Sequence, residues 1–236
     1  MIYKQIQNTS FLLDYAGGRF LVDPAFRRMD FFGAGLGTKV SLGELLDVDA
    51  VLVTHLSDTS FDGLARQLLP RGIKIFVPST RAVRELEKAG FSNVEVLQEH
   101  VHFQFVDLYR VPAYYGKEGE ARKSEKGCGV ILSHPVLNSI YLTGESVWYD
   151  GMKKTIKSWK PRLIVVQAGG VRRLDGSRLS MVHEEIAAVH LALPRAKIIA
   201  NQNVWEGDRD SLRNYLYGHR MEEAVLMPKD GEEYRL

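Results

Sequence analysis

The chain has very little cysteine and no long hydrophobic run. Its 236 residues include one cysteine, Cys128, so no disulfide can form within the chain. Two glycines flank Cys128 ahead of an apolar segment, which favours a small buried residue at the start of a strand over a nucleophile. No apolar stretch approaches the roughly 20 residues that cross a bilayer, and the first residues lack the pattern of a signal peptide. We therefore predict a cytoplasmic protein with no membrane partner.

An excess of either charge is also missing. Lysine and arginine total 31 against 29 acidic residues, which gives a net charge of +2, and basic residues gather no further than adjacent pairs. Nucleic-acid binding usually needs a basic patch or stripe, so we predict no nucleic-acid partner. The chain has no Gly-x-Gly-x-x-Gly sequence, which argues against a dinucleotide-binding loop. With 45% hydrophobic residues, it can bury a sizeable core.

What the chain does have is a regular order of strand and helix patterns. Alternating apolar and polar residues near the N-terminus, around a Gly17-Gly18 turn, indicate a β-meander. A glycine-rich stretch from 31 to 43 is typical of a loop. Strands then alternate with helices, which indicates an α/β (α+β) fold. The predicted strands cover 2–6, 11–15, 19–24, 49–54, 73–77, 94–97, 102–112, 127–133, 139–143, 162–166, 196–200 and 223–227, and the predicted helices cover 61–69, 79–89, 148–158, 181–192 and 209–217.

The segment from Val51 to Gly63 carries the most informative motif. An apolar run ends at Thr54 and His55, and a polar cluster follows before a helical pattern. This layout resembles the metallo-β-lactamase superfamily, whose His-x-His-x-Asp-His signature lies on the loop after a buried strand and holds one or two metal ions. The resemblance implies a four-layer αββα sandwich of two mixed β-sheets flanked by helices, formed by a single metallo-β-lactamase-like domain over residues 1–236.

Further segments, in the same order along the chain, strengthen the resemblance. The run from Asn8 to Pro24 is similar to the start of the branch that includes the ascorbate-6-phosphate lactonase-like hydrolases. The run from Tyr141 to Asp150 resembles Gly-Asp-Thr-x-Trp-Tyr, in which the Asp bridges two metals. The run from Leu163 to Gly170 resembles a strand followed by Asn-Ala-Gly-Gly. The resemblance therefore spans the whole chain and implies a metal-dependent hydrolase.

Most of the metal ligands that this resemblance implies are replaced. One ligand position, His55, is unchanged, and the others hold Ser57, Thr59, Ser60, Tyr115, Glu145 and Gln202. Zinc prefers imidazole, thiolate or carboxylate ligands, and hydroxyl and amide oxygens are poor donors for it. Every replacement can still donate or accept a hydrogen bond. We therefore predict a pseudoenzyme with a degenerate metal centre and no cofactor, in which these seven positions line a pocket for a small polar ligand.

A second hypothesis keeps the chain an enzyme. In it, one weakly bound divalent metal, zinc or manganese, is held by His55 and some of Asp58, Glu145 and Asp208, and the substrate is an ester, a lactone or a phosphoester. The resemblance also leaves self-association into a homo-oligomer open, because active relatives often self-associate.

Three polar residues are predicted to start helices rather than to carry chemistry. Ser180 and Asp208 stand where two helical patterns begin, and a short polar side chain there can accept hydrogen bonds from free backbone N–H groups. Asp62, in Phe-Asp-Gly, is interpreted as a structural acid at a helix start.

Overall fold

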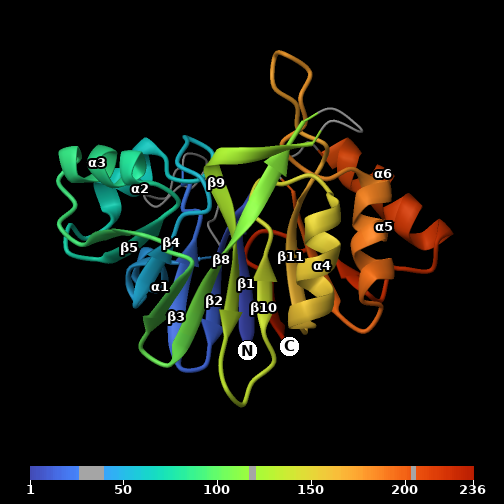
Figure 1. The fold of residues 1–236 in the computed structure, drawn as a ribbon, viewed down its shortest axis with the longest axis horizontal. Coiled ribbons are helices and arrows are strands. Elements are labelled where there is room, and N and C mark those ends of the chain that lie inside the picture. Colours follow the sequence, from blue (N-terminus) through green and yellow to red (C-terminus); the bar gives the residue numbers. More distant parts are fainter. Residues whose placement is uncertain (27–39, 117–120, 203–205) are drawn as a thin grey trace. The chain divides into compact units, whose positions relative to one another are not determined.

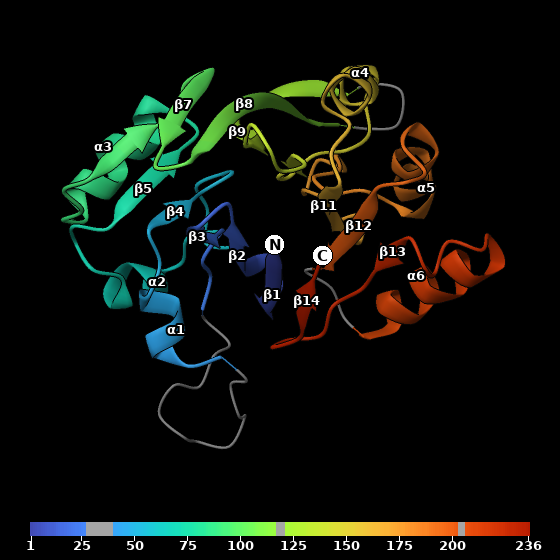
Figure 2. The same ribbon diagram turned by 90° about the horizontal axis from the view of Figure 1, so that it is seen from below.

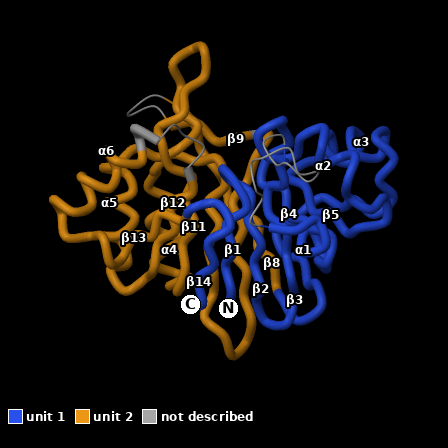
Figure 3. Tube along the Cα trace, turned by 180° about the vertical axis from the view of Figure 1, so that it is seen from behind, with its two compact units in different colours: residues 1–106, 229–236 blue, residues 107–228 orange. Residues whose placement is uncertain are grey.

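The computed structural model describes residues 1–26, 40–116, 121–202 and 206–236, and the chain forms two compact units (Figure 3). Unit 1 comprises Met1–Val106 and Lys229–Leu236, and unit 2 comprises Asp107–Pro228. The described elements include two seven-stranded sheets of mixed strand direction, with helices flanking them (Figure 1). This confirms the α+β class that the sequence predicts.

The first sheet has the strand order β14-β1-β2-β3-β4-β5-β6. Strands β14, β1, β2 and β3 pair antiparallel, whereas β3 to β6 pair parallel. The helices α1, α2 and α3 lie on one side of the parallel strands (Figure 2). The elements of this part of the chain are β1 (Ile2–Gln7), β2 (Ser10–Tyr15), β3 (Gly18–Val22), α1 (Leu42–Leu46), β4 (Ala50–Leu52), α2 (Gly63–Leu68), β5 (Lys74–Val77), α3 (Thr80–Lys88), β6 (Val94–Val96), β7 (His100–Phe103) and β14 (Glu233–Arg235).

The second sheet has the order β13-β12-β11-β10-β9-β8-β7. Here β8, β9 and β10 pair antiparallel, and β10 to β13 pair parallel. The helices α4, α5 and α6 lie on one side of the parallel strands (Figures 1 and 2). The remaining elements are β8 (Val106–Tyr115), β9 (Arg122–Ser133), β10 (Ile140–Leu142), α4 (Asp150–Trp159), β11 (Leu163–Ala168), α5 (His183–Ala192), β12 (Lys197–Gln202), α6 (Glu206–Gly218) and β13 (Val225–Leu226).

Each unit has its own hydrophobic core. In unit 1 the buried side chains of the parallel strands pack against α1, α2 and α3, with Phe61 and Phe91 in edge-to-face contact at 5.7 Å between ring centroids. In unit 2 the strands β8 to β13 pack against α4, α5 and α6. Cys128 is buried in β9, as predicted. Within the described residues, no helix is long and apolar enough to cross a membrane.

Three predicted features differ from the structure. The glycine-rich stretch falls partly outside the described residues, but its end leads into a short helix, α1, that begins after Ser41. Ser180 is not an N-cap, because α5 begins at His183 with Val182 before it, and the Ser180 hydroxyl instead accepts a hydrogen bond from Val171 N at 2.8 Å. Helix α6 begins at Glu206, so Asp208 lies inside the helix, and its side chain is outside the described part of the chain.

Helix α1 gives a testable electrostatic contribution to stability. Ser41 and Glu44 form a capping box, and Glu44 also pairs with Lys4 of β1. These hydrogen bonds lower the pKa of Glu44 from 4.5 to about 2, and the one from Lys4 has the largest effect. A carboxylate whose pKa is lowered by folding stabilises the folded state above its unfolded pKa, and this stabilisation is lost as the pH falls through the folded value.

We expect Glu44→Gln to lower the free energy of unfolding near pH 7. The loss should be only about 1 kcal/mol, because about a third of the Glu44 side chain is exposed and solvent weakens the interaction. The difference from the wild type should shrink as the pH falls from 4.5 toward 2 and vanish below pH 2, as measured by urea unfolding at each pH. Glu87→Gln, on the exposed face of α3, is the control and should change little. A difference for Glu44→Gln that persists unchanged at low pH would contradict the assignment.

Candidate functional site

The loop from Thr54 to Ser60 follows β4 at the carboxyl end of the parallel strands of unit 1. Asp23 follows the neighbouring strand β3 and is buried, with its backbone in the left-handed region at φ 45°. Its carboxylate accepts hydrogen bonds from Thr54 N and Thr54 Oγ1, both at 2.7 Å. The start of the loop is therefore fixed to the next strand by two charge-assisted hydrogen bonds.

His55 is buried, and both of its ring nitrogens face hydroxyl groups. Its Nδ1 lies 3.3 Å from Thr54 Oγ1, and its Nε2 lies 3.4 Å from Thr59 Oγ1. Because Thr54 donates its one hydroxyl proton to Asp23, Thr54 can only accept from His55 Nδ1. When the ring is neutral, its Nε2 then accepts from Thr59. The nitrogen lone pair that a metal would need is therefore directed at a threonine hydroxyl.

The other three hydroxyl side chains of the loop continue this hydrogen-bond chain. Thr59 Oγ1 lies 2.8 Å from Ser57 Oγ, which in turn accepts from Thr59 N at 3.2 Å. Ser60 is fully buried, donates to the carbonyl oxygen of His55, and accepts from Ser57 N at 3.2 Å. Each hydroxyl proton thus has an acceptor inside the loop or on Asp23. The structure brings His55, Ser57, Thr59 and Ser60 together in one hydrogen-bonded loop.

The two acidic residues near the loop have different environments. Asp62 is buried and caps α2 by accepting a hydrogen bond from Ala65 N at 2.8 Å, so its predicted structural role is confirmed. Asp58, a ligand in the single-metal hypothesis, has an exposed side chain.

Two of the distant positions lie on neighbouring segments of unit 2. Tyr115 ends β8, and Glu145 follows β10 in a segment that pairs with β8 through Val147 N and Tyr114 O, 2.8 Å apart. The Tyr115 ring lies under the guanidinium of Arg173 at 4.5 Å. Gln202 ends β12, in register with the end of β11, and its side chain lies outside the described part of the chain.

The donors in the loop do not fit the metal centre that the fold implies. Across the described ranges, no three His, Cys, Asp or Glu side chains gather into a metal-binding group. One imidazole nitrogen directed at a hydroxyl, with further hydroxyls around it, is a poor donor set for zinc or manganese. In this chain the loop is instead organised by hydrogen bonds between its own side chains.

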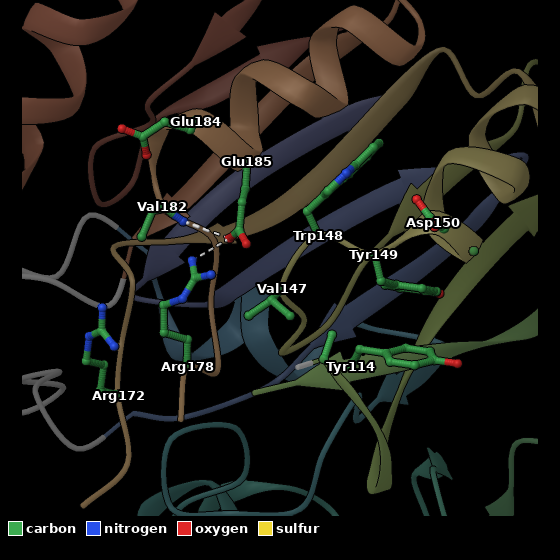
Figure 4. Close-up of a pocket in the computed structure, with 12 residues that line it drawn as sticks. Tyr114, Val147, Trp148, Tyr149, Asp150, Arg172, Arg178, Val182, Glu184 and Glu185 are labelled. Carbon is green, nitrogen blue, oxygen red and sulfur yellow. Dashed lines mark hydrogen bonds and ion pairs between the residues drawn. The ribbon is translucent and has the colours of Figure 1, made fainter. Parts of the chain in front are cut away.

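A pocket in unit 2 was not predicted from the sequence. It has a volume of about 1020 Å³ and contains a buried ion pair, in which Arg178 Nη1 lies 2.9 Å from a Glu185 carboxylate oxygen (Figure 4). Its lining comes from segments that follow β10 and β11, from the start of α5 and from the β8 and β9 strand pair. The lining residues are Tyr114, Ala121, Val147, Trp148, Tyr149, Asp150, Gly151, Arg172, Arg178, Val182, Glu184 and Glu185.

One weak signal for this pocket is present in the sequence. Asp175 and Gly176 mark a turn, and the turn places Arg172 and Arg178 opposite each other on a short hairpin. Nothing local in the sequence indicates that Arg178 meets Glu185, because that contact depends on how the hairpin packs on α5.

Comparison with known proteins identifies the fold and the family. No protein-family model matches the chain. The isothiocyanate hydrolase from Delia radicum gut bacteria is 26% identical, with a TM-score of 0.86 over 100% of this chain and 99% of that one. A possible metal-dependent hydrolase from Veillonella parvula is 24% identical, with a TM-score of 0.87 over 100% and 99% of the two chains. The metallo-β-lactamase fold protein YhfI from Bacillus subtilis is 10% identical, with a TM-score of 0.68 over the full length of both.

The structural likenesses establish the metallo-β-lactamase fold that the loop and strand motifs predict. In sequence, the UPF0173 protein YddR from Bacillus subtilis is 35% identical to the chain, over 99% of this chain and 99% of that protein. The chain therefore belongs to the UPF0173 family.

Proposed function

We propose that this protein is a metallo-hydrolase-fold member whose metal centre is degenerate, and that it binds a small polar ligand without metal-dependent hydrolysis. The observation that supports the proposal is the hydrogen-bond chain through Ser57, Thr59 and His55. In this proposal the chain descends from the ascorbate-6-phosphate lactonase-like branch, which its Asn8 to Pro24 segment resembles, and the ligand positions of that branch have become hydrogen-bonding positions.

The physical argument concerns charge as well as coordination. A two-metal centre needs several ligands that can balance the ions' positive charge, and carboxylates left around a missing ion would repel one another. In this loop the aspartate position holds Thr59, and the two lost histidine positions hold serines. The hydroxyls satisfy one another and the His55 carbonyl, so the loop can keep its conformation with no cation.

Metal analysis tests the proposal directly. Protein purified without chelator, then exposed to zinc or manganese and dialysed, should carry far less than one ion per chain by elemental analysis. The thermal midpoint should not shift when either metal is added. One zinc, manganese or iron ion bound per chain would overturn the proposal.

A designed gain of metal binding shows whether the loop retains the family geometry. The double variant Ser57→His, Thr59→Asp restores two ligands while leaving buried Ser60 in place to support the His55 carbonyl. We expect zinc affinity to rise at least about tenfold, the scale of a single supporting contact in a metal site. The variant Ser57→Asn, Thr59→Asn has side chains of similar size without a strong zinc ligand, and should gain nothing.

A second candidate function is favoured by the likeness to the isothiocyanate hydrolase, which extends over the whole chain. In this alternative the protein is an atypical hydrolase with one metal held by His55 and some of Asp58, Glu145 and Asp208. Activity should be assayed on an isothiocyanate, an ester, a lactone and a phosphoester, before and after chelation. Turnover that chelator abolishes and added metal restores would favour the hydrolase, and no turnover under either condition would favour the binding protein.

A further inference from the structure

The pocket of unit 2 lies where two helices begin. Helix α4 follows Tyr149 and helix α5 follows Val182, and the first residues of both helices line the pocket. The N-terminal end of a helix carries partial positive charge and free backbone N–H groups. The volume of about 1020 Å³ is at the upper end of the range for small-molecule sites. The pocket therefore has room for an organic ligand, and two helix starts contribute to its lining.

The Arg178 side chain is held firmly in this setting. Its backbone exchanges two hydrogen bonds with Gly116, at 2.9 and 3.1 Å, and its side chain is 7% exposed. The guanidinium has five N–H donors, and among the described residues its acidic partner is Glu185. One Glu185 oxygen already accepts from Val182 N at 3.2 Å. A single carboxylate cannot accept hydrogen bonds from all five N–H groups of the guanidinium. Arg178 can therefore also donate to a second anionic partner.

Glu185 competes with any anionic ligand for Arg178, and its carboxylate also accepts a hydrogen bond from Val182 N. Burial raises the pKa of Glu185, and the Arg178 guanidinium opposes that rise. The ion pair also costs solvation free energy that an apolar pair would not cost. In Figure 4 Arg178 and Glu185 face each other, while the carboxylates of Glu184 and Asp150 are directed away from the pair. Arg178 is therefore the cation at the centre of the labelled lining. Glu185 and an anionic ligand would compete for it.

The opposite side of the pocket is flat and aromatic. Tyr114 and Tyr149 stack with ring centroids 3.9 Å apart, and the Tyr149 hydroxyl donates to Pro112 O at 2.7 Å. Burial raises the pKa of Tyr149 to about 12, so the phenol keeps this proton at neutral pH. Val147 and Trp148 complete the apolar lining. These contacts fix ring positions before a ligand arrives, which reduces the entropic cost of binding.

We propose that this pocket binds a planar organic anion, an aromatic carboxylate, whose carboxylate pairs with Arg178 and whose ring lies against Val147, Trp148 and the stacked tyrosines. A planar carboxylate matches the donor geometry of an arginine in two parallel hydrogen bonds. The inference goes beyond the proposed function, because it assigns a ligand class to a pocket whose lining includes none of the seven former metal-ligand positions. Metal analysis and ligand titration therefore succeed or fail independently.

Benzoate is the probe that tests the inference on the full chain, by calorimetric titration with NMR shift mapping. Wild-type protein should bind benzoate saturably. Benzamide lacks the negative charge, and cyclohexanecarboxylate lacks the aromatic ring. The protein should bind each of them at least about tenfold more weakly than benzoate, a difference of about 1.4 kcal/mol in binding free energy. Equal binding of benzamide or of cyclohexanecarboxylate would overturn the anion or the ring part of the proposal. Absence of saturable benzoate binding would overturn the whole proposal.

Variants separate a binding role for the ion pair from a structural one. Glu185→Gln removes the competing charge and should tighten benzoate binding about tenfold, whereas Arg178→Lys loses the planar donor set and should weaken it about tenfold. Glu222→Gln, at an exposed position of unit 2 outside the pocket lining, makes the same charge change and should leave affinity within about twofold of the wild type. The double variant Arg178→Gln, Glu185→Gln keeps a neutral hydrogen-bonding pair, so it should fold, as checked by circular dichroism, and lose benzoate binding. Unchanged affinity in Glu185→Gln and Arg178→Lys would overturn the proposal.

Discussion

Replacing Asp23 by alanine is expected to lower the free energy of unfolding by about 3 kcal/mol, because two buried hydrogen bonds to a charged group are lost. Thr54 N and Thr54 Oγ1 would be left without their acceptors in a buried place. The backbone at φ 45° adds to the cost, since aspartate tolerates the left-handed region better than alanine does. Urea unfolding followed by circular dichroism measures the loss.

The control for Asp23 is an acidic residue with an exposed contact in the same unit. Asp49 accepts a hydrogen bond from Arg19 N at 2.8 Å in an exposed position, so Asp49→Ala should cost well under half as much. Thr54→Val tests the same cluster from the other side. It should cost about 1 to 2 kcal/mol, because it removes the hydroxyl that joins Asp23 to His55. Equal losses for Asp23→Ala and Asp49→Ala would show that the buried cluster is not the source of the effect.

Replacing Gly129 by valine is expected to destabilise unit 2 by about 3 kcal/mol or more through overpacking. Gly129 lies in β9, opposite Val111 of β8. A Cβ atom there would lie 2.8 Å from the backbone oxygen of Leu142 and 2.9 Å from Val111 Cγ2. Neither neighbour can move easily, because Leu142 is a paired residue of β10 and Val111 is in the core. Thermal unfolding followed by circular dichroism measures the effect.

Gly218 provides the matched control in the same unit. It ends α6, and a Cβ built there meets no atom within 4 Å. Gly218→Ala should therefore be neutral or slightly stabilising, since alanine restricts the unfolded chain more than glycine does. A large loss in Gly218→Ala, or none in Gly129→Val, would contradict the packing argument.

The sequence predicted the fold well where apolar runs were long. The β11 run from Leu163 and the β12 run from Lys197 are buried parallel strands, and such strands have the near-continuous apolar composition that the prediction used. Two short elements, β14 and α1, were missed. Strand β14 has three residues and only partial burial, so no periodicity marks it. Helix α1 was hidden by the preceding glycines, although Ser41 and Glu44 have the spacing of a capping box.

The sequence pattern predicted which residues share the candidate loop, but not how their side chains are organised. Strand ends place His55 and Ser60 on one loop, and that follows from the sequence pattern. Which nitrogen of His55 faces which hydroxyl depends on side-chain rotamers and on Asp23, a residue 32 positions earlier. The Arg178 and Glu185 pair was missed because it depends on tertiary packing of a hairpin on a helix. Local sequence patterns contain no information about such a contact.

The pairing of β1 with β14 has a consequence during protein synthesis. Tyr3 lies opposite Tyr234, so β1 is synthesised long before the strand that pairs with its outer edge. Until then the outer edge of β1 has unpaired backbone groups, which can pair with another nascent chain and begin aggregation. Closing a loop of this length is also slow compared with forming the β1 and β2 hairpin. The outer edge of β1 is therefore protected from such pairing only after β14 has been made and has paired with it.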